Sequence, residues 1–302
     1  MKCFRPIAID NPDYVLNDEY TSPYKKILVP CGRCPACIVN QANDWRQRLQ
    51  IEFEQSSSAC FITLTYDDKS LPFQTCTDSF GDSYFVPVVC KRDVQLFLKR
   101  LRKRFEDCTI RYYLVSEYGP NTFRPHYHAV VFNLPYRLHD GPVSHFRCAE
   151  AIRECWGNGM IKVDPVTSGR ISYVTKYMSC VTDLPEYLPK PFRLMSRRPG
   201  IGFNYFNKKG VVEWHRLTKS NFIINNGFQC RLPRYYKDKL FDDAMKLDIK
   251  EESIKHLQTN EYKQKFLAEC FGYNSSCDFI SDSELRFLRQ FNNKMKKSRK
   301  DI

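Results

Sequence analysis

Apolar residues recur every three or four positions in two long stretches of the chain, which is the spacing of one face of an α-helix. The first stripe is formed by Ile38, Ala42, Trp45, Leu49 and Phe53. The second falls in residues 91–105 and is formed by Val94, Phe97, Leu98, Leu101 and Phe105. We therefore expect two amphipathic helices here, and shorter helices over 144–156 and 169–180.

Strand patterns lie between these helices. The β-branched and aromatic run at 59–66 predicts a buried strand, and further strands are expected at 110–117, 126–133 and 160–164. Turn residues around a short apolar run at 70–89 indicate an inserted hairpin. The order predicts an α+β fold: an antiparallel sheet with helices on one face, in the ferredoxin-like or RRM-like arrangement.

The flanking segments differ in character. Residues 1–35 are rich in proline and are expected to be loops, and short strands are expected at 203–231. Ser281 and Glu284 have the spacing of a capping box and predict the start of a final helix. The expected domains are a cysteine-rich segment with one helix at 1–56, the core at 57–184, a proline-rich break with short strands at 185–231, and a basic helical extension at 232–302.

Composition narrows the class of partner. The 302 residues include 47 lysines and arginines against 34 acidic residues, a net charge of +13, together with 18 tyrosines and 22 phenylalanines. This combination favours nucleic acid over an anionic membrane face, because cations hold phosphates and aromatic rings stack on bases. No apolar run could span a bilayer and no secretory signal is visible, so we expect a cytosolic protein without a membrane partner. The absence of a GxxxxGK[ST] run argues against a self-contained ATP-driven motor.

Two histidines on one predicted strand are candidate metal ligands. His126 and His128 are two positions apart, so both side chains point to the same face. A hard divalent cation also needs an oxygen ligand. Glu117 ends the preceding strand and returns close to the histidines if the strands form a hairpin, while Asp164 is a reserve ligand on a neighbouring strand. The alternative is that the histidines are only polar surface.

Two tyrosines are candidate nucleophiles. Tyr173 and Tyr177 lie one turn apart if 169–180 is helical, with Lys176 beside them. A tyrosine hydroxyl can attack phosphorus, but its ordinary pKa of about 10 makes it a weak nucleophile at neutral pH. A divalent metal would polarise the phosphate, and the Lys176 ammonium would stabilise developing negative charge. The alternative is that both tyrosines belong to the packed face of the helix.

Cysteines cluster near the N-terminus. Cys31, Cys34 and Cys37 are spaced as in zinc sites, and Cys3 is the nearest spare fourth thiolate. A structural Zn²⁺ site of these four residues is our hypothesis. The alternatives are buried or loop thiols, or an iron–sulfur cluster.

Three segments together resemble the motifs of the HUH endonuclease superfamily. They are Phe61–Tyr66, His126-Tyr127-His128 with Glu117 upstream, and Tyr173–Tyr177. The likeness is greatest to the replication initiators of microviruses, and three further stretches resemble the gokushovirus branch: Met1–Cys3, Val29–Cys37 and Ser196–Gly202. The resemblance covers about residues 1–205.

This resemblance implies a rolling-circle replication initiator with Mg²⁺ or Mn²⁺ as its metal. Such a protein binds viral origin DNA, supercoiled or single-stranded, and nicks one strand. It stays joined to the 5′ phosphate through tyrosine and leaves a 3′ hydroxyl for the host polymerase. A second tyrosine later cleaves the regenerated origin, and the displaced strand is ligated into a circle. A host helicase would separate the strands, in the cytoplasm of the bacterial host.

Cations near the motifs are candidate DNA contacts, although most charged runs are simply solvated faces. The set comprises Arg100, Arg102, Lys103, Arg104, Arg124 and Arg170, with the basic tail at 294–300. Two rival interpretations remain open. One is a plasmid initiator, relaxase or transposase of the same superfamily. The other is a non-enzymatic, zinc-containing nucleic-acid-binding protein whose tyrosines only stack on bases.

Overall fold

A computed structural model describes residues 3–10, 25–119, 121–135, 141–176, 184–225 and 227–300. The chain divides into two compact units, one of residues 42–212 and one of residues 1–41 with 213–302. The helices are α1 (Pro35–Gln55), α2 (Lys91–Arg104), α3 (Gly141–Trp156), α4 (Ser168–Lys176), α5 (Val211–Thr218), α6 (Arg234–Leu240), α7 (Asp243–Cys270) and α8 (Ser276–Lys300).

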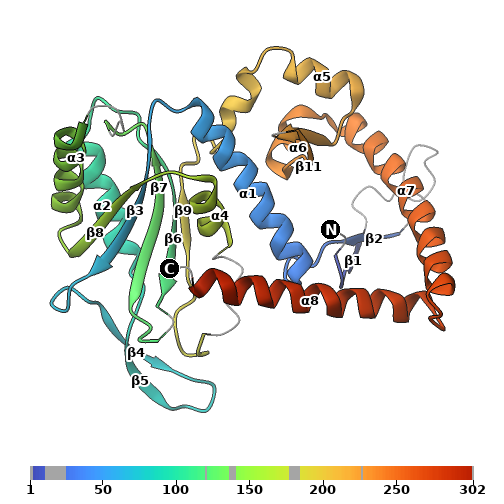
Figure 1. The fold of residues 1–302 in the computed structure, drawn as a ribbon, viewed down its shortest axis with the longest axis horizontal. Helices are drawn as coiled ribbons and strands as arrows, with labels where there is room; N and C mark the ends of the chain where they lie inside the picture. Colours follow the sequence, from blue (N-terminus) through green and yellow to red (C-terminus); the bar gives the residue numbers. More distant parts are fainter. Residues whose placement is uncertain are drawn as a thin grey trace. The chain divides into compact units, whose positions relative to one another are not determined.

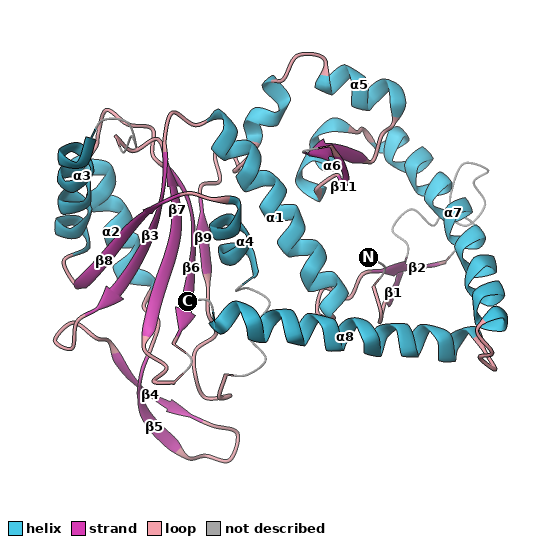
Figure 2. Ribbon diagram, in the orientation of Figure 1, coloured by secondary structure: helices cyan, strands magenta, loops and turns pink. Residues whose placement is uncertain are grey.

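The strands appear in Figures 1 and 2 as arrows. They are β1 (Ile7–Asp10), β2 (Lys26–Val29), β3 (Ala59–Tyr66), β4 (Phe73–Thr77), β5 (Ser83–Pro87), β6 (Arg111–Tyr118), β7 (Pro125–Phe132), β8 (Gly159–Pro165), β9 (Arg193–Met195), β10 (Phe222–Asn225) and β11 (Phe228–Arg231).

An antiparallel sheet organises the unit of residues 42–212. Its strand order is β8-β3-β7-β6-β9, and every neighbouring pair runs antiparallel. The chain order β3-α2-β6-β7-α3-β8 is the β-α-β-β-α-β order of the ferredoxin-like motif, with the β4–β5 hairpin inserted after β3. The predicted α+β class with an antiparallel sheet is confirmed.

One face of the sheet packs against α2 and α3 (Figure 1). The buried residues of α2 are those of the predicted apolar stripe: Val94, Phe97, Leu98 and Leu101. Trp156 ends α3 and is fully buried, with its ring centre 5.1 Å from that of Tyr66. Its indole N–H donates to the carbonyl of Thr65 at 3.2 Å, so the large ring is buried without an unpaired polar atom.

The opposite face packs against α4 and the later part of α1. Leu49 of α1 and Ile171 and Val174 of α4 lie in one buried cluster with Phe61 and Val130 of the sheet. Because β3 and β7 are covered on both faces, both sets of alternating positions are largely apolar. The histidines and Glu117 share this second face, so α4 lies above them.

Three expectations for the flanking segments are wrong. Residues 1–35 contain the paired strands β1 and β2, and β9 forms inside the proline-rich break by pairing with β6. The region 203–231 holds a short 3₁₀-helix and α5 before its two strands. In each case neighbouring strands or packing override a weak local signal.

The final helix begins earlier than its expected cap at Ser281 and Glu284. α8 starts at Ser276, and Ser275 caps it: the backbone N–H of Asp278 donates to Ser275 Oγ at 3.1 Å. The Ser275 hydroxyl also donates to the Asp278 carboxylate at 2.8 Å. These residues meet the spacing rule one turn and a half upstream, which leaves Ser281 inside the helix. Within the described part of the chain, none of the helices is both long and apolar enough to cross a membrane.

A buried carboxylate in α1 fastens the far end of β6. Glu52, whose side chain is 1% exposed, pairs with Arg111 and accepts the backbone N–H of Gly202 at 2.6 Å. Arg111 also donates to the carbonyls of Pro199 and Gly200 at 3.0 Å each. Replacing Glu52 would leave this arginine with no carboxylate.

We predict that Glu52→Ala lowers the free energy of unfolding by about 3 kcal/mol, because it removes one partner of a buried ion pair. Urea denaturation followed by circular dichroism measures the loss. Glu54→Ala is the matched control, since Glu54 lies on the same helix, is 41% exposed and meets Lys208 only at 3.5 Å. Equal midpoints for the two variants would contradict the structural role of Glu52.

Candidate active site

The two candidate histidines lie side by side on β7, between β3 and β6. In the sheet register, Thr65 is opposite His126 and Thr63 is opposite His128 on one side. On the other side Glu117 is opposite His126. The predicted hairpin of β6 and β7 therefore does bring Glu117 back to the histidine pair.

Both imidazoles are held from β3 by threonine hydroxyls. Thr63 Oγ1 lies 3.1 Å from His128 Nδ1, and Thr65 Oγ1 lies 3.2 Å from His126 Nδ1. These contacts point the Nε2 atoms away from β3. When Nδ1 carries the proton and donates to threonine, Nε2 keeps a lone pair for a metal. Sequence analysis singled out residues 61–66 as a motif but missed this role, although the Thr-x-Thr spacing was its signal.

Three reactive groups converge at His128. Its Nε2 lies 3.0 Å from Glu117 Oε2. The hydroxyl of Tyr173 donates to the same carboxylate oxygen at 3.3 Å and lies 3.4 Å from His128 Nε2. Phe61 stacks on the His128 ring with centres 5.8 Å apart, and it also contacts Tyr173 edge-on. A phenol from α4, an imidazole from β7 and a carboxylate from β6 therefore share one half-buried point.

His126 is oriented differently. Its Nε2 faces Gly119, where a Cβ atom would come within 3.4 Å of it. Burial and the neighbouring His128 both lower the pKa of His126, so its neutral, metal-binding form is favoured. Among the residues that the structure describes, the N-terminal cysteines are the group of three or more ligand residues with all donor atoms within 4.8 Å. The two histidines and Glu117 are adjacent but are not gathered that tightly.

The donor set nevertheless fits a divalent cation. Two neutral imidazoles and one carboxylate offer the nitrogen and oxygen atoms that Mn²⁺ accepts, and Mg²⁺ would rely more on the carboxylate and on water. Asp164, the reserve ligand, is otherwise engaged: it lies opposite Phe61 and pairs with Arg170 at 3.2 Å and Lys162 at 3.6 Å.

The remaining candidates of the tyrosine motif are only partly visible. Lys176 is exposed on the last turn of α4. Tyr177 lies outside the described residues, and so does the end of the predicted helix 169–180. The position of the second tyrosine relative to His128 therefore stays a prediction.

Three of the expected DNA contacts bind carbonyl groups within the protein. Arg100 donates to the carbonyls of Cys155 and Trp156 at 2.6 and 2.9 Å, where α3 ends. Arg124 donates to the carbonyl of Tyr66 at 2.7 Å. Arg170 donates to the carbonyl of Pro165 at 2.8 Å. These guanidinium groups help to hold the fold around the site.

A basic groove lies beside α2 and the β6–β9 edge of the sheet, with a volume of about 750 Å³. Arg102 lines it, with its guanidinium carbon 5.3 Å from the centre of the Tyr112 ring. Lys91, Arg197 and Arg198 also line this groove, and sequence analysis did not single them out as DNA contacts. The groove combines cations with an aromatic face, which suits a nucleic-acid strand.

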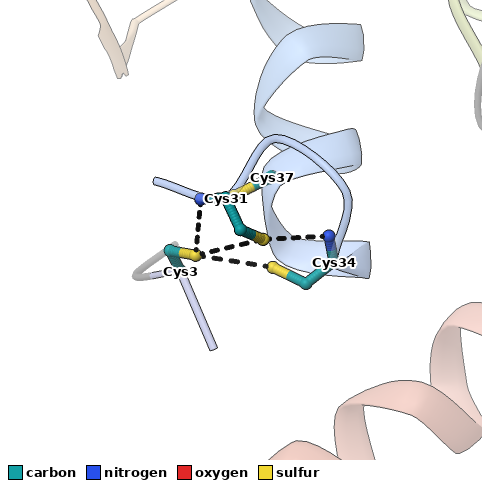
Figure 3. A group of neighbouring side chains, drawn as sticks. All are labelled: Cys3, Cys31, Cys34 and Cys37. Carbon is teal, nitrogen blue, oxygen red and sulfur yellow. Dashed lines mark hydrogen bonds between the residues drawn. The ribbon is translucent and has the colours of Figure 1, made fainter. Parts of the chain in front are cut away.

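The four candidate zinc ligands meet at one point, as Figure 3 shows. Cys3 Sγ lies 3.5 Å from Cys31 Sγ and 3.8 Å from Cys34 Sγ. Backbone hydrogen bonds from Arg33 and Cys34 lower the pKa of Cys31 to about 6, while burial raises that of Cys37 to about 12. Such a group could bind a metal such as zinc.

Comparison with known proteins gives one family and several relatives. The family model for replication-associated proteins of the ORF2 type matches residues 59–181, a range that holds Glu117, both histidines and Tyr173. Replication-associated protein ORF2 of Spiroplasma virus 4 is 25% identical over 296 residues, which cover 91% of this chain and 84% of the relative. No solved structure matches the chain.

Two further relatives come from phages of other bacteria. Replication-associated protein VP4 of Bdellovibrio phage phiMH2K is 25% identical over 310 residues, covering 92% of each chain. Replication-associated protein ORF4 of Chlamydia phage 1 is 24% identical over 261 residues, covering 80% of this chain and 60% of the relative. The resemblance predicted from the three motifs is thereby confirmed, and the comparisons support a phage replication initiator of the rolling-circle type.

Proposed function

We propose that this chain is a metal-dependent HUH endonuclease that nicks the origin of a single-stranded-DNA phage and starts rolling-circle replication. The observation that carries the proposal is the position of the Tyr173 hydroxyl, 3.3 Å from Glu117 and 3.4 Å from His128. A nucleophile beside two potential metal ligands is what tyrosine-mediated cleavage of a phosphodiester requires. The names of the relatives support the assignment to phage DNA replication.

The proposed metal site consists of His126, His128 and Glu117. A bound Mg²⁺ or Mn²⁺ would polarise the scissile phosphate and orient it for in-line attack. Thr63 and Thr65 would keep the ring protons on Nδ1, so that both Nε2 atoms face the metal. Phe61 and α4 cover the imidazole of His128 and limit its access to water.

Tyr173 is the proposed first nucleophile. Its O–H already donates to Glu117, so the proton that must leave has an acceptor. The phenolic oxygen forms a bond to phosphorus while the bond from phosphorus to the 3′ oxygen breaks, and that oxygen takes up a proton from solvent. One phosphodiester replaces another, so rejoining requires no ATP. This agrees with the absence of a P-loop.

Tyr177 is the proposed second nucleophile, and Lys176 would stabilise negative charge on the phosphate. Alternation of the two tyrosines would allow the regenerated origin to be cleaved and the displaced strand to be closed into a circle. We propose the host helicase and polymerase as partners, acting with this chain on supercoiled and single-stranded viral DNA in the bacterial cytoplasm.

A purely DNA-binding role has less support. A tyrosine that only stacks on bases should present its ring to solvent, whereas Tyr173 is half-buried and contacts His128 edge-on with ring centres 5.1 Å apart. A relaxase or transposase of the same superfamily would use the same chemistry. The similarity to phage replication proteins over most of their length favours the initiator.

We predict that the double variant Tyr173→Phe plus Tyr177→Phe forms no covalent complex with DNA, because both attacking oxygens are gone. The measurement is a denaturing gel of labelled origin DNA incubated with the protein and Mn²⁺. Tyr262→Phe is the matched control, since Tyr262 is 75% exposed on α7. A double variant that still forms the adduct at the wild-type level would refute the assignment.

We predict that Thr63→Val weakens Mn²⁺ binding roughly tenfold to 100-fold, because valine keeps the shape but no longer accepts the His128 N–H. Isothermal titration with Mn²⁺ gives the dissociation constant directly. Thr63→Ser should restore much of the affinity, since the hydroxyl returns. Unchanged Mn²⁺ affinity in the valine variant would show that this hydroxyl does not position the metal ligand.

We predict that Arg102→Ala weakens binding of unrelated DNA sequences uniformly and reduces the salt dependence of log K by roughly 1, because one phosphate contact is lost. Fluorescence anisotropy over a range of salt concentrations measures both quantities. Arg153→Ala removes an equal charge from α3, where Arg153 pairs with Glu150, and serves as the control. If both variants behave alike, the groove is not the DNA path.

A further inference from the structure

We propose that Cys3, Cys31, Cys34 and Cys37 form a structural Zn²⁺ site that fastens the N-terminal segment to the start of α1. Neither the nicking chemistry nor the relatives' names account for this cluster. Cys3 belongs to the segment before β1, Cys31 and Cys34 follow β2, and Cys37 is in the first turn of α1. The site would thus join three segments of one compact unit.

The spacing of the sulfur atoms fits one tetrahedral zinc ion. Zinc–sulfur bonds of about 2.3 Å place the four sulfurs of a tetrahedron about 3.8 Å apart. The separations of Cys3 Sγ from Cys31 Sγ and Cys34 Sγ are 3.5 and 3.8 Å, and all four sulfurs lie within 4.8 Å of one another. A multi-iron cluster would have to lie between the thiolates and hold them farther apart, so the geometry favours a single ion.

Backbone N–H groups point at these sulfur atoms. The N–H of Cys31 donates to Cys3 Sγ at 3.2 Å, and the N–H of Cys34 donates to Cys31 Sγ at 3.3 Å. Zinc bound by four thiolates displaces their protons to solvent and leaves a site of charge −2. Hydrogen bonds from N–H groups stabilise that charge and orient the ligands. Gly32 adopts φ +72°, the left-handed conformation that lets the loop turn back on itself.

Ordinary packing explains other cysteines of the chain but not these. Cys60, Cys148 and Cys155 are buried among the large apolar side chains of the sheet and its helices. The N-terminal group instead forms a small separate cluster with Ala36 and Phe4. Few apolar side chains surround it, so its burial alone contributes little to stability.

The proposed site would stabilise a unit with a small core. Phe4 follows Cys3 and contacts Phe287 of α8 edge-on, with ring centres 5.7 Å apart. A metal that fixes Cys3 also fixes this contact, so binding energy would be transferred to the helical extension. Small units commonly use a metal in this way when apolar burial is limited.

Metal analysis of the purified, reduced full-length protein tests the proposal without any DNA. We expect about one zinc per chain, and X-ray absorption at the zinc edge should show four sulfur ligands at about 2.3 Å. Three results would overturn the proposal: folded protein without zinc, iron in its place, or a zinc shell containing nitrogen or oxygen. The readout is independent of nicking, so it stands or falls separately from the proposed function.

Variants locate the site. Cys34→Ser and Cys37→Ser should each retain zinc roughly 100-fold less well against a competing chelator, because a ligand is lost. Cys277→Ser is the matched control, since Cys277 is an exposed thiol on α8. Equal zinc retention in the three variants would overturn the assignment.

Hydrogen exchange of the wild-type chain avoids any dependence on variant folding. Removal of zinc should accelerate exchange in residues 3–10 and 25–41 while β3, β6 and β7 stay protected. Exchange that does not change in these segments would mean that no structural metal was removed, and would contradict the proposal.

Discussion

The contact between Tyr173 and the His128–Glu117 pair depends on how α4 packs on the sheet. Ile171 and Val174 are fully buried against the face that carries the histidines. This packing holds the helix at a fixed rotation, and Tyr173, between these two residues in sequence, reaches the polar end of the same face. Because burial of two aliphatic side chains sets the position of the phenol, the nucleophile is positioned before any DNA or metal binds.

The sheet fixes the other half of the site. Antiparallel register places a threonine of β3 and a residue of β6 on either side of each histidine, so the four side chains of a row have little freedom to rotate. His128 extends from Thr63 to Glu117, and His126 extends from Thr65 toward Gly119. The absence of a side chain at Gly119 leaves the second Nε2 accessible. The two imidazoles are thus equivalent in support but different in outlook.

Much of the core could be predicted from the sequence because local and tertiary preferences agree there. The strand at 59–66 and the helix stripe from Val94 to Leu101 have strong periodicity and are buried on the expected faces. The histidine pair and Glu117 could be brought together because strand alternation and one hairpin suffice. The role of Thr63 could not, since it depends on the register between β3 and β7, which are more than 60 residues apart in sequence. β9 is three residues long and exists only by pairing with β6. Arg100 and Arg170 were expected to meet DNA because their charge is visible in the sequence, whereas the carbonyls that they bind are not.

The central claim is that Tyr173 is brought to a phosphate by its neighbours on β6 and β7. Tandem mass spectrometry of the protein–DNA complex, after nuclease digestion, identifies the residue that carries the nucleotide. The account predicts a phosphonucleotide on the tyrosines of the peptide that spans residues 173–177, with Tyr173 modified. A nucleotide attached to a tyrosine or serine elsewhere in the chain would contradict it.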